Sequence, residues 1–170
     1  MQTTPGTITA PRLGRYDIDT DRSAITFRTR HMFGLGPVHG RFAIRSGSIE
    51  IREPLASSAV RAEIDAATFG TGNPARDATV RSAKFLDAGR HPVMTFTADR
   101  ADGGRIDGIL TVRGVSQPVR LVVDEFDGKP QSFTARGRTR IDRTSFGLTA
   151  MRGLAGRFLD ITVRLSCVQK

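Results

Sequence analysis

Apolar side chains recur at every second position in segment after segment of this chain, and this alternation constrains the fold more than any other feature. In residues 24–31, Ile25 and Phe27 alternate with Thr26 and Arg28. Such spacing places one set of side chains on each face of a β-strand. We therefore predict about eight half-buried strands. Their inward sets run through Ile25–Thr29, Val38–Ile44, Val60–Ile64, Met94–Ala98, Ile106–Val112, Val119–Val123, Phe133–Ile141 and Leu159–Leu165.

One stretch, residues 73–92, breaks the alternation. Val80, Lys84 and Phe85 recur there at helix-like spacing. Asparagine is a good helix cap, proline suits the first helical position, and glycine followed by proline ends a helix. These signals are Asn73 and Pro74 at the start, and Gly89 and Pro92 at the end.

Eight antiparallel strands with one short helical excursion predict an all-β domain, either a closed barrel or a two-sheet sandwich. Closure removes exposed strand edges. The interior of a barrel of about eight strands is filled by side chains or holds one small ligand. We expect residues 1–15 to form a flexible N-terminal arm and residues 16–170 to form the barrel domain.

The composition of the inward sets bears on whether such a barrel is hollow. Many of their members are small, which predicts free space inside. The ten phenylalanines of the chain could instead fill a dry core. The small inward residues are Thr29, Gly40, Ala62, Ala98, Gly108, Ala135 and Thr139.

The net charge of +9, from 26 Lys and Arg against 17 Asp and Glu, raises the prospect of an anionic partner. A nucleic-acid surface interleaves aromatic platforms with positive charge, but the chain has no tryptophan and one tyrosine. The densest basic run, Arg136–Arg143, is interpreted first as a solvated outer face, with an anionic membrane surface or nucleic acid as alternatives. The start of the chain carries no secretory signal pattern, so we expect a soluble, cytoplasmic protein.

The segment "RHMFGLGPVHGRF" holds two of the three histidines and three glycines. A dinucleotide fingerprint would need its third glycine where His39 stands, and a helix afterwards, whereas an alternating strand pattern follows. We interpret the segment as a hairpin. His31, His39 and His91 could bind a metal or act as acid or base, but structural hydrogen bonding is favoured because an orienting carboxylate is lacking nearby. His31 continues an inward set and is a candidate for a ligand's head group.

Two other residues carry reactive or charged groups on inward-facing positions. Arg143 falls on the inward side of its strand, where a buried guanidinium needs a partner. That partner is either an acidic side chain, in a structural ion pair, or the polar head group of a ligand. Cys167 extends the apolar face of the last strand and is predicted to be a small buried apolar group.

Four segments resemble motifs of the YceI-like family, in the same order. They are "YDIDTDRSAITFRTRHMFGLGPVHGRF", "VRSAKFLDAGRHPVMTFTA", "GILTVRGVSQPVRL" and "RTSFGL". The resemblance implies an antiparallel, eight-stranded, lipocalin-like barrel whose elongated apolar cavity holds a polyisoprenoid or another lipophilic molecule.

The alternation and the resemblance together predict a carrier or sequestering protein that binds a lipophilic small molecule and is not an enzyme. No cofactor, metal or nucleic acid is expected, while transient membrane contact and a homodimer stay open. The alternatives are a small-molecule enzyme that uses His31 and Arg143, or an arginine surface that binds nucleic acid or protein. The predicted ligand-binding residues are Phe27, His31, Phe42, Val60, Ile64, Phe85, Phe96, Leu110, Arg143 and Phe146.

Overall fold

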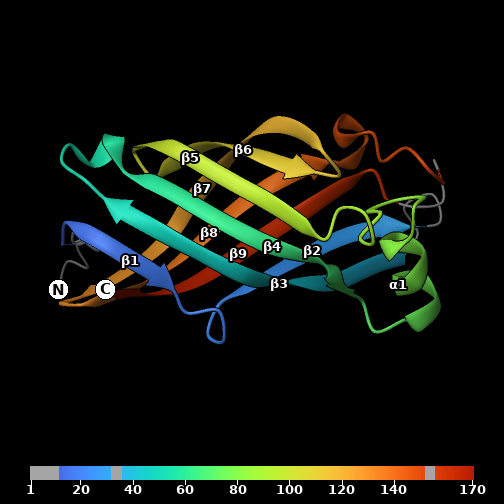
Figure 1. Cartoon of the computed structure of the whole chain (residues 1–170), viewed down its shortest axis with the longest axis horizontal. Helices are drawn as coiled ribbons and strands as arrows, with labels where there is room; N and C mark the ends of the chain where they lie inside the picture. Colours follow the sequence, from blue (N-terminus) through green and yellow to red (C-terminus); the bar gives the residue numbers. More distant parts are fainter. Residues whose placement is uncertain (1–11, 32–35, 152–155) are drawn as a thin grey trace, which may run out of the picture.

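The computed structural model describes residues 12–31, 36–151 and 156–170, with the backbone alone at His31. This part of the chain is almost entirely antiparallel β-structure (Figure 1). One α-helix, α1 (Pro74–Arg81), and two short 3-10 turns, η1 (Leu55–Ser57) and η2 (Arg143–Phe146), interrupt the strands. The strands are β1 (Gly14–Ile18), β2 (Ala24–His31), β3 (Gly36–Ile51), β4 (Ala59–Gly70), β5 (Val93–Asp102), β6 (Arg105–Val112), β7 (Val115–Lys129), β8 (Ser132–Asp142) and β9 (Phe158–Gln169).

The strands β2 to β9 form a closed ring, because each pairs with the next and β9 pairs back with β2. The predicted eight-stranded barrel is therefore confirmed. β1 pairs with both β3 and β9, in line with β2, so β1 and β2 are two halves of one interrupted strand. Ile18 lies opposite Cys167 and Ala24 lies opposite Arg164. Five residues thus face a gap of two in β9, and the surplus leaves the sheet as a loop.

Helix α1 begins where the sequence predicts, but it ends earlier. Asn73 caps it, since the Asn73 side chain accepts a hydrogen bond of 3.1 Å from the Arg76 amide. The predicted stop at Gly89 is wrong. After Arg81 the chain tightens, and the Ser82 amide donates to the carbonyl oxygen of Thr79, three residues back. Phe85 therefore lies in the turns between α1 and β5.

Two of the predicted gaps in the interior are filled by aromatic rings. A Cβ atom at Gly40 would overlap the ring of Phe27, and one at Gly108 would overlap the ring of Phe96. Both glycines therefore accommodate the ring of a neighbouring strand. At these two positions a small residue allows packing, and the expectation that it leaves empty space is wrong.

Two separate clusters of buried apolar side chains close the barrel. The terminal cluster lies towards the two chain ends and contains Tyr16, Ile18, Ile44, Ile49, Ile51, Phe133 and Cys167 (Figure 1). The helix-end cluster lies towards α1 and contains Phe27, Ile64, Ala66, Phe69, Leu86, Ala88, Met94, Val112, Phe146 and Leu148. No helix in the described ranges combines the length and the apolar character needed to cross a membrane.

Candidate ligand-binding cavity

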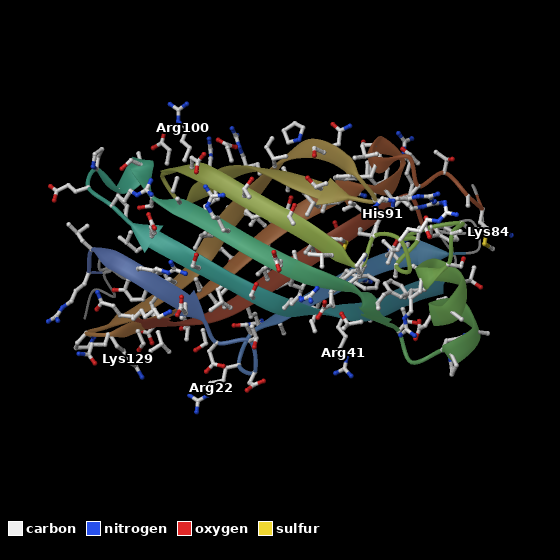
Figure 2. All side chains as sticks on the ribbon, in the orientation of Figure 1. Arg22, Arg41, Lys84, His91, Arg100 and Lys129 are labelled. Atoms are coloured by element: carbon white, nitrogen blue, oxygen red, sulfur yellow. The ribbon has the colours of Figure 1, made fainter. Side chains whose placement is uncertain are left out.

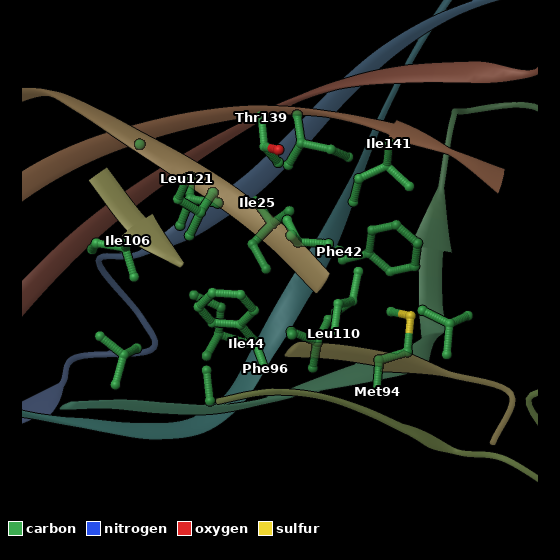
Figure 3. Close-up of a pocket in the computed structure, with 18 of the residues that line it drawn as sticks. Ile25, Phe42, Ile44, Met94, Phe96, Ile106, Leu110, Leu121, Thr139 and Ile141 are labelled. Carbon is green, nitrogen blue, oxygen red and sulfur yellow. The ribbon is translucent and has the colours of Figure 1, made fainter. Parts of the chain in front are cut away.

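A cavity of about 230 Å³ lies inside the barrel, lined by 28 residues that come from both buried clusters and from the wall between them. Phe96, Leu110, Leu121 and Thr139, from β5, β6, β7 and β8, surround the same space (Figure 3). A cavity needs only about 10–15 Å³ on this measure to hold one water molecule, so the space is large enough for part of an organic ligand.

The exposure of the inward side chains agrees with a hollow interior. Ile106, Leu121 and Val163 line the cavity, yet each remains only half-buried. Inward side chains of a filled barrel would be fully buried by their opposite neighbours. Among the described residues that line the cavity, Thr139 and Arg143 alone have side chains that contain nitrogen or oxygen. The wall is therefore suited to an apolar molecule with few polar groups.

Most of the predicted ligand-binding residues lie on this wall. The structure brings seven of them together around the cavity, which are Phe42, Val60, Ile64, Phe96, Leu110, Arg143 and Phe146. The side chain of His31 lies outside the described residues, so the structure does not test the predicted pairing of His31 with Arg143. Phe27 and Phe85 are buried beside the cavity and do not line it.

Phe27 lies behind the wall because of its aromatic neighbours. Its ring stacks on Phe69, with centroids 5.2 Å apart, and lies 5.7 Å from Phe42. Phe42 and Phe69 are in turn 5.5 Å apart, edge to face. Three rings in mutual contact close the helix end of the barrel, and only Phe42 reaches the cavity.

Arg143 is the one charged residue among the described residues of the wall, and it is 7% exposed. Its Nε donates to the carbonyl oxygen of Gly156 at 2.8 Å, and Nη1 donates to that of Leu148 at 2.6 Å. The guanidinium carbon also lies 5.4 Å from the centre of the Phe85 ring, which explains the burial of Phe85. These contacts tie η2 to the chain that follows it and to the turns after α1, and they place a positive charge beside an apolar cavity.

Asp142, at the start of η2, orders the same region. It accepts hydrogen bonds from the Thr144 amide at 3.0 Å and from Arg157 at 2.9 Å. The hydrogen bond from Arg157, followed by those from Thr144, lowers the pKa of Asp142 to about 2. The carboxylate is therefore ionised throughout the neutral and mildly acidic range and keeps Arg157 beside η2.

Leu86 and Leu148 line the cavity but were not among the predicted residues. Both lie outside the strands, in the turns after α1 and after η2. Alternation identifies only residues that belong to strands, so it gives no signal for these two. Ile106, Leu121 and Ile161 also line the cavity, and their inward orientation does follow from the alternation.

The groups that could carry out chemistry are poorly placed for it. Cys167 is fully buried, and burial raises the pKa of its thiol to about 12, so it is not a nucleophile at neutral pH. His39 is exposed on β3, opposite Arg28 on the outer face. Within the described residues, no three His, Cys, Asp or Glu side chains are grouped so as to hold a metal ion.

The family model of the YceI-like domain matches residues 16–167. This chain belongs to the YceI-like family. A UPF0312 protein of Enterobacter sp. (strain 638) is 31% identical over 169 residues, which cover 91% of this chain and 86% of that protein. Protein YceI of Escherichia coli O157:H7 is 29% identical over 169 residues, covering 91% and 87%.

Solved structures show the same barrel. A polyisoprenoid binding domain from Saccharophagus degradans has a TM-score of 0.72 at 17% identity, covering 94% of this YceI-like chain and 100% of that domain. Burkholderia cenocepacia BcnA has a TM-score of 0.71 at 20% identity, covering 88% and 98%. At these identities the similarity establishes the fold, which agrees with the closed barrel described above.

Proposed function

We propose that this protein binds a lipophilic molecule, a polyisoprenoid or another long-chain lipid, inside the barrel and carries or sequesters it unchanged. The observation that carries this proposal is the cavity itself, whose wall is apolar except at Thr139 and Arg143. The neighbour from Saccharophagus degradans is described as a polyisoprenoid binding domain, which supports this class of ligand.

The wall can supply enough binding energy without any chemistry. Each buried methylene group contributes about 0.8 kcal/mol, so roughly ten of them contribute on the order of 8 kcal/mol before ordering costs. A long chain buries further methylene groups that offset the ordering costs, and a net free energy of about 8 kcal/mol corresponds to a dissociation constant of about 1 μM. Desolvation of an apolar chain is thus sufficient, and polar groups are needed only to orient the ligand.

Arg143 is the proposed anchor for a polar or anionic head group, with Thr139 as a second hydrogen-bonding site. The two carbonyl contacts hold the guanidinium in place before a ligand arrives. A charged donor fixed beside an apolar wall is suited to orient one end of a long chain. We assign Arg143 no catalytic role, and the fully buried Cys167 supplies no nucleophile.

The proposal includes transient contact with a membrane. Polyisoprenoids and long-chain lipids are stored in bilayers because their chains are costly to expose to water. A carrier must therefore collect its ligand from a bilayer or deliver it there.

A matched pair of variants on β5 tests the proposal. Phe96 lines the cavity, whereas Thr97 is on the opposite face of the strand, beside Arg61 of β4. Phe96→Glu places a carboxylate against the ligand, where an unpaired charge costs several kcal/mol. We expect binding of a fluorescent polyisoprenoid to fall about tenfold or more in Phe96→Glu and to change little in Thr97→Glu.

Circular dichroism of both variants checks that they fold. Equal binding by Phe96→Glu and the wild type would contradict the proposal, as would failure of the wild type to bind any lipophile. Mass spectrometry of an organic extract of protein purified without denaturation would identify the ligand carried from the cell.

A further inference from the structure

The charges of this protein are distributed unevenly along the barrel. We define the helix end as the described segments that surround α1 and η2, and the terminal end as those that surround the two chain ends. The helix end comprises residues 28–31, 36–41, 66–93, 111–116, 141–151 and 156–160. The terminal end comprises residues 12–23, 46–60, 98–108, 121–134 and 165–170.

Hydrogen bonds join segments within each set. At the helix end, the Arg113 side chain donates to the carbonyl oxygen of Phe85 at 3.0 Å, and the Gln117 side chain donates to that of Ser145 at 2.9 Å. At the terminal end, the Lys170 amide donates to the carbonyl oxygen of Arg15. Figure 1 shows α1 at one extreme of the barrel, and β1 and the C-terminus at the other.

The helix end contains ten Arg and Lys residues against four Asp residues, a net charge of +6 with histidine neutral. The terminal end contains eight Arg and Lys residues against eleven Asp and Glu residues. Asp107, Asp124 and Glu125 of this end are paired with Arg120, Arg136 and Arg138 from the middle of the barrel, so the local net charge is zero. The overall charge of the chain hides this difference. In the labelled side chains, Lys84 lies at the helix end and Arg41 points outward near it, whereas Arg100 and Lys129 lie at the terminal end (Figure 2).

Apolar side chains are exposed at both ends and do not by themselves distinguish them. Val115, Met151 and Phe158 are exposed at the helix end, and Leu55 and Val168 at the terminal end. Only at the helix end are they combined with excess positive charge. Arg140 and Arg157 lie over the ring of Phe158, 4.6 and 5.1 Å from its centre.

We propose that the helix end docks on the surface of an anionic lipid bilayer, with the terminal end directed away from it. Anionic lipids attract basic protein surfaces, and exposed apolar side chains strengthen the contact by entering the interface. The terminal end, with a local net charge of zero, offers no comparable attraction to the bilayer. Nucleic acid fits less well, because Phe158 is the only exposed aromatic among the described residues and its ring already contacts two arginines.

This orientation deepens the proposed carrier function and rests on it for its purpose. Leu86, Phe146 and Leu148 close the helix end of the cavity, and all three lie outside the strands. Docking at this end places the irregular closure of the cavity against the bilayer that supplies or receives the ligand.

The test measures binding to lipid vesicles by cosedimentation, with two double variants of equal charge change. Arg41→Glu/Lys84→Glu alters exposed residues of the helix end, and Arg100→Glu/Lys129→Glu alters exposed residues of the terminal end. None of the four lines the cavity. The vesicles are phosphatidylcholine with about one third phosphatidylglycerol, or phosphatidylcholine alone.

We expect the wild type to prefer the anionic vesicles and the helix-end variant to lose about tenfold or more of that binding. The terminal-end variant should stay within about twofold of the wild type. Equal losses in both variants, or equal binding to both kinds of vesicle, would overturn the proposal. So would tighter binding to a single-stranded oligonucleotide that is lost in the helix-end variant.

The Phe96→Glu variant separates this proposal from the proposed function. We expect it to retain vesicle binding although it loses the soluble fluorescent polyisoprenoid. A wild type that docks on vesicles but binds no lipophile would contradict the carrier function alone. If Phe96→Glu folded but no longer bound vesicles, vesicle binding would depend on the cavity and not on the surface of the helix end. The docking proposal would then fail.

Discussion

The two ends of the barrel are closed in different ways. Strand residues close the terminal end. The ring centroid of Phe133 of β8 lies 4.9 Å from that of Tyr16 of β1 and 5.2 Å from that of Phe126 of β7. Cys167 of β9 is fully buried in the same cluster. Tyr16, Phe133 and Cys167 are each paired with a strand on both sides, and Phe126 is paired with β8. The terminal end therefore resembles a conventional packed core.

Irregular segments complete the helix end. Leu86, Phe146 and Leu148 come from turns, and side-chain contacts to backbone carbonyls hold these turns in place, as Arg143 does for Leu148 and Gly156. Segments of this kind open locally at lower free energy than strands in the middle of a sheet. An end that is closed by apolar side chains can therefore still open locally. We expect ligand exchange to occur at the helix end.

We expect the terminal end to be the more stable of the two ends. Phe133→Ala removes the ring shared by Tyr16 and Phe126, and truncation of a buried phenylalanine costs about 3–5 kcal/mol. We expect a loss of this size in the free energy of unfolding, measured with urea. Phe158→Ala is the matched control, because that ring is exposed and its removal should cost well under about 1 kcal/mol.

The rate of ligand release from Phe133→Ala tests at which end of the barrel the ligand leaves. Release should remain close to that of the wild type under conditions where the variant is folded, since the exchange route lies at the other end. Release accelerated as strongly as unfolding would place the route at the terminal end instead.

A smaller loss of stability with a larger effect on exchange is expected at Arg143. Arg143→Met keeps the length of the side chain but removes its donors to Leu148 and Gly156, and hydrogen bonds from a charged group contribute about 1.5–3 kcal/mol. We expect the free energy of unfolding to fall by about 2–3 kcal/mol. Ligand release, followed by stopped-flow fluorescence, should be at least several-fold faster than in the wild type.

Arg143→Lys separates charge from geometry in that experiment. Lysine keeps the positive charge but lacks the fork that reaches two carbonyl groups. Release intermediate between the wild type and Arg143→Met would support the role of geometry. Wild-type release in both variants would show that the turns at the helix end do not limit exchange.

The contrast between the ends also marks how far the sequence could predict this protein. The closed barrel is implied by the family resemblance, and Phe146, in η2, lies in the "RTSFGL" motif of that resemblance. The strands and the other six predicted wall residues follow from alternation, because a strand fixes the side on which each residue lies. Phe96 and Leu110 are examples, and both line the cavity. Alternation places Phe27 inward as well, but only its ring contacts with Phe42 and Phe69 keep it off the wall. Alternation predicts the face of the sheet on which a side chain lies, but not whether that side chain reaches the cavity.

The helix end was predicted less well for a related reason. Helix-like spacing extended α1 to Gly89, although the chain leaves the helix at Arg81 and uses Leu86 to close the cavity. The position of Leu148 likewise depends on its contact with Arg143, which joins residues of irregular backbone. Long-range contacts determine such segments, and a local pattern contains no record of them.

The last expected difference between the ends is a small one, in their response to pH. At the terminal end, burial raises the pKa of the Cys167 thiol from 9.0 to about 12. Its contribution to stability is therefore complete below pH 9 and is lost as the pH rises from 9 towards 12. The stability difference between the wild type and Cys167→Ala, measured with urea, should narrow on the alkaline side and stay constant from pH 5 to 8.

At the helix end the sign is reversed. The hydrogen bond from Arg157, with those from Thr144, lowers the pKa of Asp142 from 3.8 to about 2, so this stabilisation is complete above pH 4 and is lost as the pH falls towards 2. Asp142→Asn keeps an oxygen for the Thr144 amide but removes the charge that attracts Arg157. Because both partners are near the surface, we expect a small stability difference from the wild type, constant between pH 5 and 8, shrinking below pH 4 and vanishing as the pH falls through 2. Urea midpoints at pH 7, 5 and 2.5 measure it, and a difference that grows in acid would show that Asp142 does not stabilise the helix end through its charge.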